Sequence, residues 1–280
     1  MEIKTADIAK LKKTARMIRI DILKMLTIAG SGHTGGSLSA TDIVTALYFA
    51  KMRHDPNNPE WQERDRFILS KGHAAPLLYA VLARSEYFGM DMLTTLRKID
   101  SPLQGHPSKN TLPGIEASTG SLGQGLSIAN GIALGLRLDG YNARVYVLLG
   151  DGETQEGQVW EAAMTSSHYK IDNLCAIIDN NGLQIDGRVK DVMGIDPLVD
   201  KWRAFGWHTI EIDGHDMEEI LSAFDEAEEV KGKPTMIIAH TIKGKGVSFF
   251  EGKARYHGIA PTPEELATAL LELEDKDLVV

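Results

Sequence analysis

The first half of the chain alternates between helical patterns and glycine-rich segments. Residues 6–28 place apolar side chains three and four positions apart, which predicts an amphipathic helix beginning near Thr5 and Asp7. Four glycines between positions 30 and 36 then predict a flexible loop. Beyond this loop, the pattern predicts helices at 40–51, 75–85 and 126–138, a short strand at 66–70, and a long proline- and glycine-rich loop at 101–125.

The second half has the rhythm of strands separated by helices. Short apolar or β-branched runs occupy 144–149, 174–178, 209–212 and 235–239. Helical patterns lie between and beside them at 158–169, 197–205 and 217–230. This alternation is typical of an α/β fold, a doubly wound and mainly parallel sheet with helices on both faces. Thr262 and Glu265 form a capping box that predicts one more helix near the end of the sequence.

Composition narrows the class of protein without identifying it. The 280 residues are 43% hydrophobic and 25% charged, as in an ordinary globular protein, and we expect a single domain over 1–280. Thirty basic and 39 acidic side chains give a net charge of −9, which argues against nucleic-acid or membrane partners.

Cysteine usage and the N-terminus indicate a compartment. Cys175 is the single cysteine of the sequence, so an internal disulfide is excluded and a reducing compartment is favoured. Residues 1–4 lack the apolar stretch of a secretory signal, and apolar runs of membrane-spanning length do not occur. We therefore expect a cytoplasmic protein.

Polar residues follow each predicted strand of the second half. Gly150-Asp151-Gly152 follows one strand, and Asp179-Asn180-Asn181-Gly182 follows the next. We call such a polar segment directly after a strand a strand exit. Glycine, aspartate and asparagine are common turn formers, so one strand exit alone is weak evidence for a binding site. Because ligands of open α/β sheets bind at the carboxyl ends of the strands, two neighbouring polar exits together indicate a binding site.

The two exits suit a magnesium diphosphate. Asp151 supplies a carboxylate oxygen and Asn181 an amide oxygen, which are ligands that Mg²⁺ shares with the phosphates of its ligand. A helix beginning near 156–158 would point its N-terminal amides at such a phosphate. The nucleotide-binding patterns G-x-x-x-x-G-K-[ST] and strand-linked G-x-G-x-x-G do not occur.

GDGETQEGQVWEA followed by IIDNNGLQIDG resembles the thiamine diphosphate motif in its transketolase version. The similarity extends along almost the whole chain, and so many motifs in the family's order make it highly specific. The further motifs are SGHTGG, DRFILSKGHAAPLLYA, GHP, TGSLGQGL, AFGWH, DGH, HTIKGKG and YHG. Together they are similar to the N-terminal, diphosphate-binding third of transketolase.

The resemblance implies a set of cofactor residues. Mg²⁺, or Ca²⁺ or Mn²⁺ in its place, would be held by Asp151, Asn181 and the carbonyl of Leu183. Gly152 and His73 would contact the diphosphate of thiamine diphosphate, and Lys243 matches a lysine near the cofactor. The remaining cofactor-site residues carried over are Gly120, Ser121 and Leu122 beside the aminopyrimidine ring, and Glu156 near the contact between cofactor-binding halves.

Three histidines match those that face the sugar substrate in the family, namely His33, His106 and His257. Making and breaking a C–C bond beside a ketose carbonyl requires proton removal and delivery, which imidazoles perform near neutral pH. An isolated loop histidine is more often a surface residue, and the matched motifs are what favour a catalytic role for these three. The histidines expected to be structural or exposed are His54, His168, His208, His215 and His240.

The resemblance also implies a missing half. Similar transketolases continue for several hundred residues, and their next domain binds the aminopyrimidine. The chain therefore resembles the N-terminal subunit of a split transketolase, which transfers a two-carbon ketol unit between sugar phosphates only with a separate C-terminal subunit, two copies of each. Ile259 replaces a lysine of animal-like transketolases, and the role of Gln184 stays open.

Other functions remain open at this point. The nearest are the α subunit of a 2-oxo acid dehydrogenase and a subunit resembling deoxyxylulose phosphate synthase, against which the GHP and YHG elements favour transketolase. A non-catalytic cofactor-binding subunit is the alternative from a different class.

Overall fold

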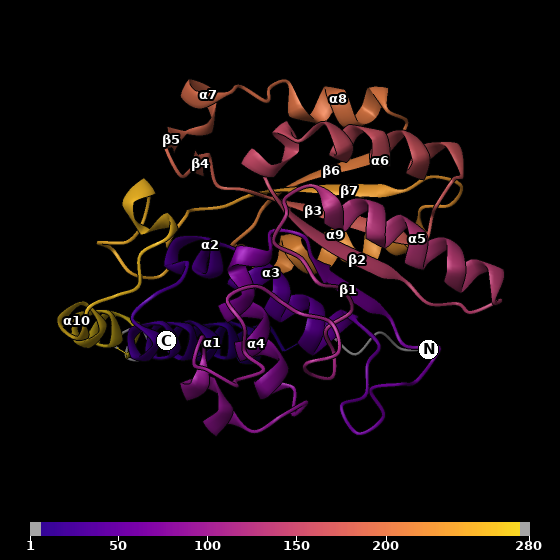
Figure 1. The fold of residues 1–280 in the computed structure, drawn as a ribbon. Helices are drawn as coiled ribbons and strands as arrows, with labels where there is room; N and C mark the ends of the chain where they lie inside the picture. Colours follow the sequence, from indigo (N-terminus) through magenta and orange to yellow (C-terminus); the bar gives the residue numbers. More distant parts are fainter. Residues whose placement is uncertain (1–6, 275–280) are drawn as a thin grey trace.

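The computed structural model describes residues 7–274, and a parallel five-stranded sheet lies at its centre (Figure 1). Its strands lie side by side in the order β1-β2-β3-β7-β6. Every pair is parallel, so the carboxyl ends of all five strands meet at one edge. The bounds are β1 (Arg66–Leu69), β2 (Val145–Gly150), β3 (Leu174–Asn180), β6 (His208–Asp213) and β7 (Thr235–His240).

Helices cover both faces of the sheet, which confirms the doubly wound α/β fold. Along β2, Tyr146 and Leu148 pack into one apolar cluster, and Val145, Val147 and Leu149 pack into the other. One face is covered by α5 (Gln124–Leu138), α6 (Gly157–His168) and α8 (Leu198–Ala204). The other is covered by α1 (Ile8–Ala29), α3 (Thr41–Ala46), α4 (Ala75–Arg84) and α9 (Met217–Glu229).

The loop predicted for the four glycines is wrong in its second half. Gly30 ends α1 with a left-handed φ of 65°, but residues 34–39 form a further helix, α2 (Thr34–Ser39). A Cβ on Gly35 would lie 2.8 Å from Lys243 Cγ, and one on Gly36 would lie 3.3 Å from His73 Nε2. These glycines therefore allow close packing against two predicted site residues, rather than a turn.

The helix ends follow their capping residues. The Asp7 side chain accepts a hydrogen bond from the backbone of Lys10 at the start of α1, whereas Thr5 lies outside the described residues, as do residues 1–4. Thr262 and Glu265 exchange the two hydrogen bonds of the predicted capping box before α10 (Pro263–Glu274).

Smaller elements complete the chain, among them a hairpin that the sequence pattern did not predict. They are the π-helical η1 (Leu47–Lys51), the 3₁₀ turns η2 (Gly72–Ala74), η3 (Met90–Thr95), η4 (Gly152–Gln155) and η5 (Ala254–His257), the hairpin β4 (Leu183–Gln184) with β5 (Gly187–Arg188), and α7 (Val189–Val192). Across residues 7–274, none of the helices combines the length and apolar character that crossing a membrane demands.

Candidate active site

A cavity of about 170 Å³ opens at the carboxyl ends of β2 and β3. Its wall comes from the β2–α6 connection, the β3–β4 connection, α2, and the segments that carry His73, Lys243 and His257. The cavity therefore lies where the two polar strand exits predict a ligand.

Asp151 connects the two strand exits. Its side chain is 2% exposed and accepts hydrogen bonds from the backbone N–H of Gly152 at 2.7 Å and of Gly182 at 2.5 Å. Asn181 precedes Gly182, and its Oδ1 accepts from the N–H of Leu183 at 3.1 Å. The carboxylate thus lies against the loop that carries the other two predicted metal ligands.

This donor set fits a divalent cation. Burial and the charge of Asp179 raise the pKa of Asp151 to about 6, so the ionised carboxylate is costly without a positive partner. Within residues 7–274, no group of three or more histidine, cysteine or acidic side chains is placed to hold a metal. A cation here would need further oxygens, which a diphosphate in the cavity would supply.

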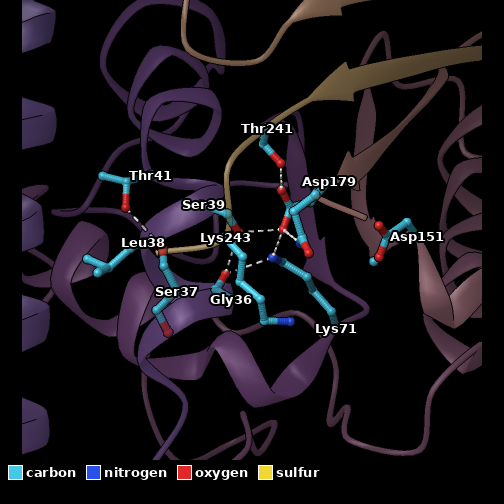
Figure 2. Close-up of polar contacts among 12 residues, drawn as sticks. Gly36, Ser37, Leu38, Ser39, Thr41, Lys71, Asp151, Asp179, Thr241 and Lys243 are labelled. Carbon is cyan, nitrogen blue, oxygen red and sulfur yellow. Dashed lines mark hydrogen bonds and ion pairs between the residues drawn. The ribbon is translucent and has the colours of Figure 1, made fainter. Parts of the chain in front are cut away.

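Lys71 and Asp179 form a buried ion pair close to Asn181 (Figure 2 shows the pair). Lys71 is 1% exposed and Asp179 is fully buried, and the Lys71 ammonium donates to Asp179 and to the Gly36 carbonyl. Asp179 also accepts from Asn181 Nδ2 at 2.9 Å, and Ser39 and Thr241 complete its hydrogen bonds. The pair therefore orients the Asn181 amide so that its oxygen, which accepts from the N–H of Leu183, keeps a second lone pair for a cation.

Glu153 anchors the glycine-rich loop before α5. Its buried carboxylate accepts from Ser70 Oγ, from the backbone N–H of Gly123 at 2.8 Å and from that of Gly150 at 2.9 Å. Burial raises its pKa. The carboxylate ties β1, β2 and the 120–123 loop together, which places Leu122 in the cavity wall.

Four histidine rings gather at one end of the cavity. His33 lies 5.1 Å from His73, 5.5 Å from His257 and 6.3 Å from His106, measured between ring centroids. Burial and the charge of Arg97 lower the pKa of His33 to about 4, and burial and the charge of Lys243 lower that of His257 to about 3. Both rings are therefore neutral at physiological pH.

Two ring nitrogens of this cluster can meet a ligand, Nδ1 of His33 and Nε2 of His257. The buried Nδ1 of His33 has no hydrogen-bond partner among residues 7–274. Lys243 Nζ lies 2.9 Å from Nδ1 of His257, so a donating ammonium leaves the ring proton of His257 on Nε2. The cluster thus offers both a proton acceptor and an N–H donor.

Lys243 connects the histidines to the metal end. Its side chain is 2% exposed, and Nζ lies 2.8 Å from the Leu183 carbonyl, whose second lone pair is left for a cation. Burial and the charge of Lys71 lower the pKa of Lys243 to about 8. The lysine remains mostly charged at neutral pH and suits a phosphate.

Most of the predicted site residues line one cavity. They are His73, Leu122, Asp151, Gly152, Glu156, Asn181, Leu183, Lys243 and His257. His33 and His106 belong to the same site through ring contacts, since His33 lies beside His73 and His106 lies beside His33. Gly120 lies against His106, because a Cβ on Gly120 would be 3.1 Å from that ring. Ser121 is exposed beside Leu122 and stays outside the cavity wall.

Sequence reasoning missed several residues that line the cavity. Lys71 and Glu153 also line the cavity, and both lie inside the motifs quoted above. Each is a charged residue close to a buried apolar strand, and this pattern could have indicated a functional charge. Gln184, whose role was left open, accepts from Gln155 Nε2 at 2.7 Å and lies against Gly152. Ile259 is 46% exposed, and its carbonyl accepts from Thr34.

Comparisons with known proteins show the family to which the chain belongs. Residues 9–273 match the family described as transketolase, thiamine diphosphate binding domain. The chain is 47% identical over 264 residues to the 6-deoxy-6-sulfo-D-fructose transketolase subunit SqwG of Clostridium sp. (strain MSTE9), covering 94% of this chain and 96% of that protein. It is 42% identical over 276 residues to an apulose-4-phosphate transketolase subunit of Phocaeicola vulgatus, covering 99% and 96%.

Longer relatives and solved structures match over part of their length. Human transketolase is 45% identical over 264 residues, which cover 94% of this chain and 41% of that protein. Transketolase from Leishmania mexicana superposes with a TM-score of 0.89 at 33% identity, covering 94% of this chain and 41% of that one. The chain thus spans about two fifths of these transketolases, and it belongs to the transketolase thiamine diphosphate-binding domain family.

Proposed function

We propose that this chain is the N-terminal subunit of a two-subunit transketolase, which transfers a two-carbon ketol unit between ketose and aldose phosphates. The main supporting observation is that one cavity brings together the buried Asp151 carboxylate, which needs a cation, and a cluster of neutral histidines. Two relatives of nearly the same length are named transketolase subunits, which supports this part of the proposal. Their names carry different sugars, so we propose the reaction class without one preferred sugar.

The metal end would hold the cofactor. Asp151, Asn181 and the Leu183 carbonyl would bind Mg²⁺, with Ca²⁺ or Mn²⁺ as substitutes, and His73 and Lys243 would contact the diphosphate. Gly152 would allow the diphosphate to approach the backbone. Residues 120–122 would lie beside the aminopyrimidine, and Glu156 would lie near the partner half. Thiamine diphosphate, when bound, supplies an electron sink for the carbanion formed as the ketose C–C bond breaks.

The histidine end would handle the protons of the sugar. His33 is a neutral imidazole whose Nδ1 is unpaired in the described part of the chain, so it can accept a hydroxyl proton, whereas His257 offers the N–H of Nε2 as a hydrogen-bond donor. His106, at the exposed side of the cluster, would contact the substrate where it enters. Partial burial of His33 and His257 limits water around the reacting atoms.

A second polypeptide would complete the site. We propose that residues 1–280 form one diphosphate-binding domain and that the pyrimidine-binding half comes from a separate C-terminal subunit, two copies of each forming the cytoplasmic enzyme. The experiment is to co-express both chains and measure turnover of xylulose 5-phosphate with ribose 5-phosphate. Ketol transfer that requires both chains supports the proposal, whereas pyruvate decarboxylation or cofactor binding without turnover contradicts it.

A further inference from the structure

The segment that carries Lys243 is held on both sides of that residue. It comprises residues 241–246, directly after β7. On one side, Nε2 of His215 accepts a hydrogen bond from the N–H of Ile242 at 2.9 Å. On the other, Nε of Arg19 in α1 donates to the carbonyl of Lys245 at 3.1 Å. Elements distant in sequence therefore fix the main chain before and after Lys243.

Asp42 joins these two contacts. Its carboxylate, in α3, accepts from Arg19 Nη1 at 2.9 Å and Nη2 at 2.7 Å, and from His215 Nδ1 at 2.8 Å. Asp42 and Arg19 are each 7% exposed. Burial alone would raise the pKa of Asp42, but the charge of Arg19 and the bonds from His215 and Arg19 hold it well below its usual value. We refer to Arg19, Asp42 and His215 as the Asp42 clamp.

The hydrogen bonds settle the tautomer of His215. The backbone N–H of Ile242 can only donate, so Nε2 must carry a lone pair and the ring proton lies on Nδ1. That proton is donated to Asp42. Asp42 thereby holds the ring with its lone pair toward Ile242.

The glycines of the segment make such anchors important, in addition to the hydrogen bonds of Gly244 N–H to the Gly35 carbonyl and of Gly252 N–H to the Lys243 carbonyl. Gly244 and Gly246 have φ values of 83° and 103°, which glycine adopts without strain, and glycine leaves the chain many alternatives when it is not held. A Cβ on Gly246 would lie 2.9 Å from Arg19 Cδ, so Arg19 packs directly against the segment. The position of the Lys243 Cα decides where its long side chain can reach.

We propose that the Asp42 clamp positions Lys243, keeping Nζ at the Leu183 carbonyl and at His257, where it meets the diphosphate. This inference rests on the proposed function, because it takes the cavity to bind thiamine diphosphate. The clamp residues themselves lie outside the cavity wall, so they act through the 241–246 segment. His215 is then a positioning residue, beyond the structural role expected from its sequence alone.

A pair of substitutions at His215 separates positioning from general stability. His215→Gln keeps an acceptor near the position of Nε2, whereas His215→Asn keeps a donor toward Asp42 but is too short to reach Ile242. His208→Gln is the matched control, since His208 also bonds a carboxylate, that of Glu226, but away from the 241–246 segment. Alanine at Asp42 is avoided, because it would leave the Arg19 charge buried without its partner.

Two readouts decide the proposal. Calorimetric titration with thiamine diphosphate and Mg²⁺ should give His215→Asn an affinity about threefold to tenfold lower, with His215→Gln and His208→Gln within about twofold of the unmodified chain. Hydrogen–deuterium exchange of residues 241–246 in the cofactor-free chain should rise in the Asn variant and stay unchanged in the others.

Undiminished affinity of the Asn variant, or unchanged exchange in that variant, would overturn the clamp. Failure of the unmodified chain to bind thiamine diphosphate, alone or with its partner subunit, would contradict the proposed function instead. The exchange comparison would still decide whether these residues hold the segment.

Discussion

Lys71 and Asp179 form an ion pair in the interior, directly behind the loop that carries Asn181. The pair joins the segment after β1 to the end of β3, residues 108 positions apart in the sequence. Because the same carboxylate accepts from the Asn181 amide, the pair sets the orientation of a predicted metal ligand.

Removing the cation of this pair should be strongly destabilising. Lys71→Met leaves Asp179 buried without its counter-charge, and we expect the free energy of unfolding to fall by about 3–5 kcal/mol. Urea unfolding measures this loss. The double variant Lys71→Met/Asp179→Asn should lose less than the sum of its single variants, since the uncompensated charge is gone. Additive losses would contradict the pairing.

Glu153→Gln tests the anchor of the glycine-rich loop. The amide oxygen of glutamine can replace only one of the two carboxylate oxygens. The NH₂ group would then face the backbone N–H of Gly150 or Gly123, so that two donors would meet without an acceptor. We expect a loss of about 1–3 kcal/mol in urea unfolding. Glu161→Gln, on the exposed side of α6, is the control and should change little. An equally small loss of unfolding free energy in Glu153→Gln would contradict the role of Glu153 as the anchor of the glycine-rich loop.

The depressed histidine pKa values predict acid sensitivity. Unfolded histidine titrates near pH 6.5, whereas folded His33 titrates near 4 and His257 near 3. The unfolded chain therefore binds more protons between these values, and stability should fall as pH drops from about 6.5 toward 4. Urea midpoints at several pH values should show a shallower decline for His33→Asn. If the urea midpoint fell equally steeply with pH in the unmodified chain and in His33→Asn, the low pKa of His33 would be contradicted.

Cys175 should be chemically inert in the folded chain. It is fully buried in β3, and burial raises its pKa to about 12, so the reactive thiolate is scarce at pH 8. We expect negligible reaction with a disulfide reagent until urea unfolds the chain, followed by one thiol per molecule. Rapid labelling without urea would show that β3 opens locally.

The sequence pattern predicts the sheet well because buried parallel strands are continuous apolar runs. The runs at 144–149 and 174–178 match β2 and β3 within two residues at each end, and Asp151 and Asn181 follow at the shared edge. The histidines came from matched motifs, since an isolated loop histidine carries little information.

What the pattern missed depends on contacts between distant segments. Gly35 and Gly36 look like loop residues, yet their missing side chains make room for Lys243 and His73 inside α2. The partner of Lys71 is far away in the sequence, so burial of this charge could not be read from its neighbours. The β4–β5 hairpin has strands of two residues each, too short for a periodic signal.

The central claim is that Asp151 holds a metal that binds the diphosphate, and calorimetric titration with thiamine diphosphate tests it most directly. The chain, with its partner subunit if binding requires it, should bind the cofactor with Mg²⁺ and lose that binding with a chelator. Asp151→Asn should weaken metal-dependent binding at least about 100-fold, while Asp186→Asn, an exposed acid of the same cavity, should bind normally. Undiminished, Mg²⁺-dependent binding by Asp151→Asn would contradict the account.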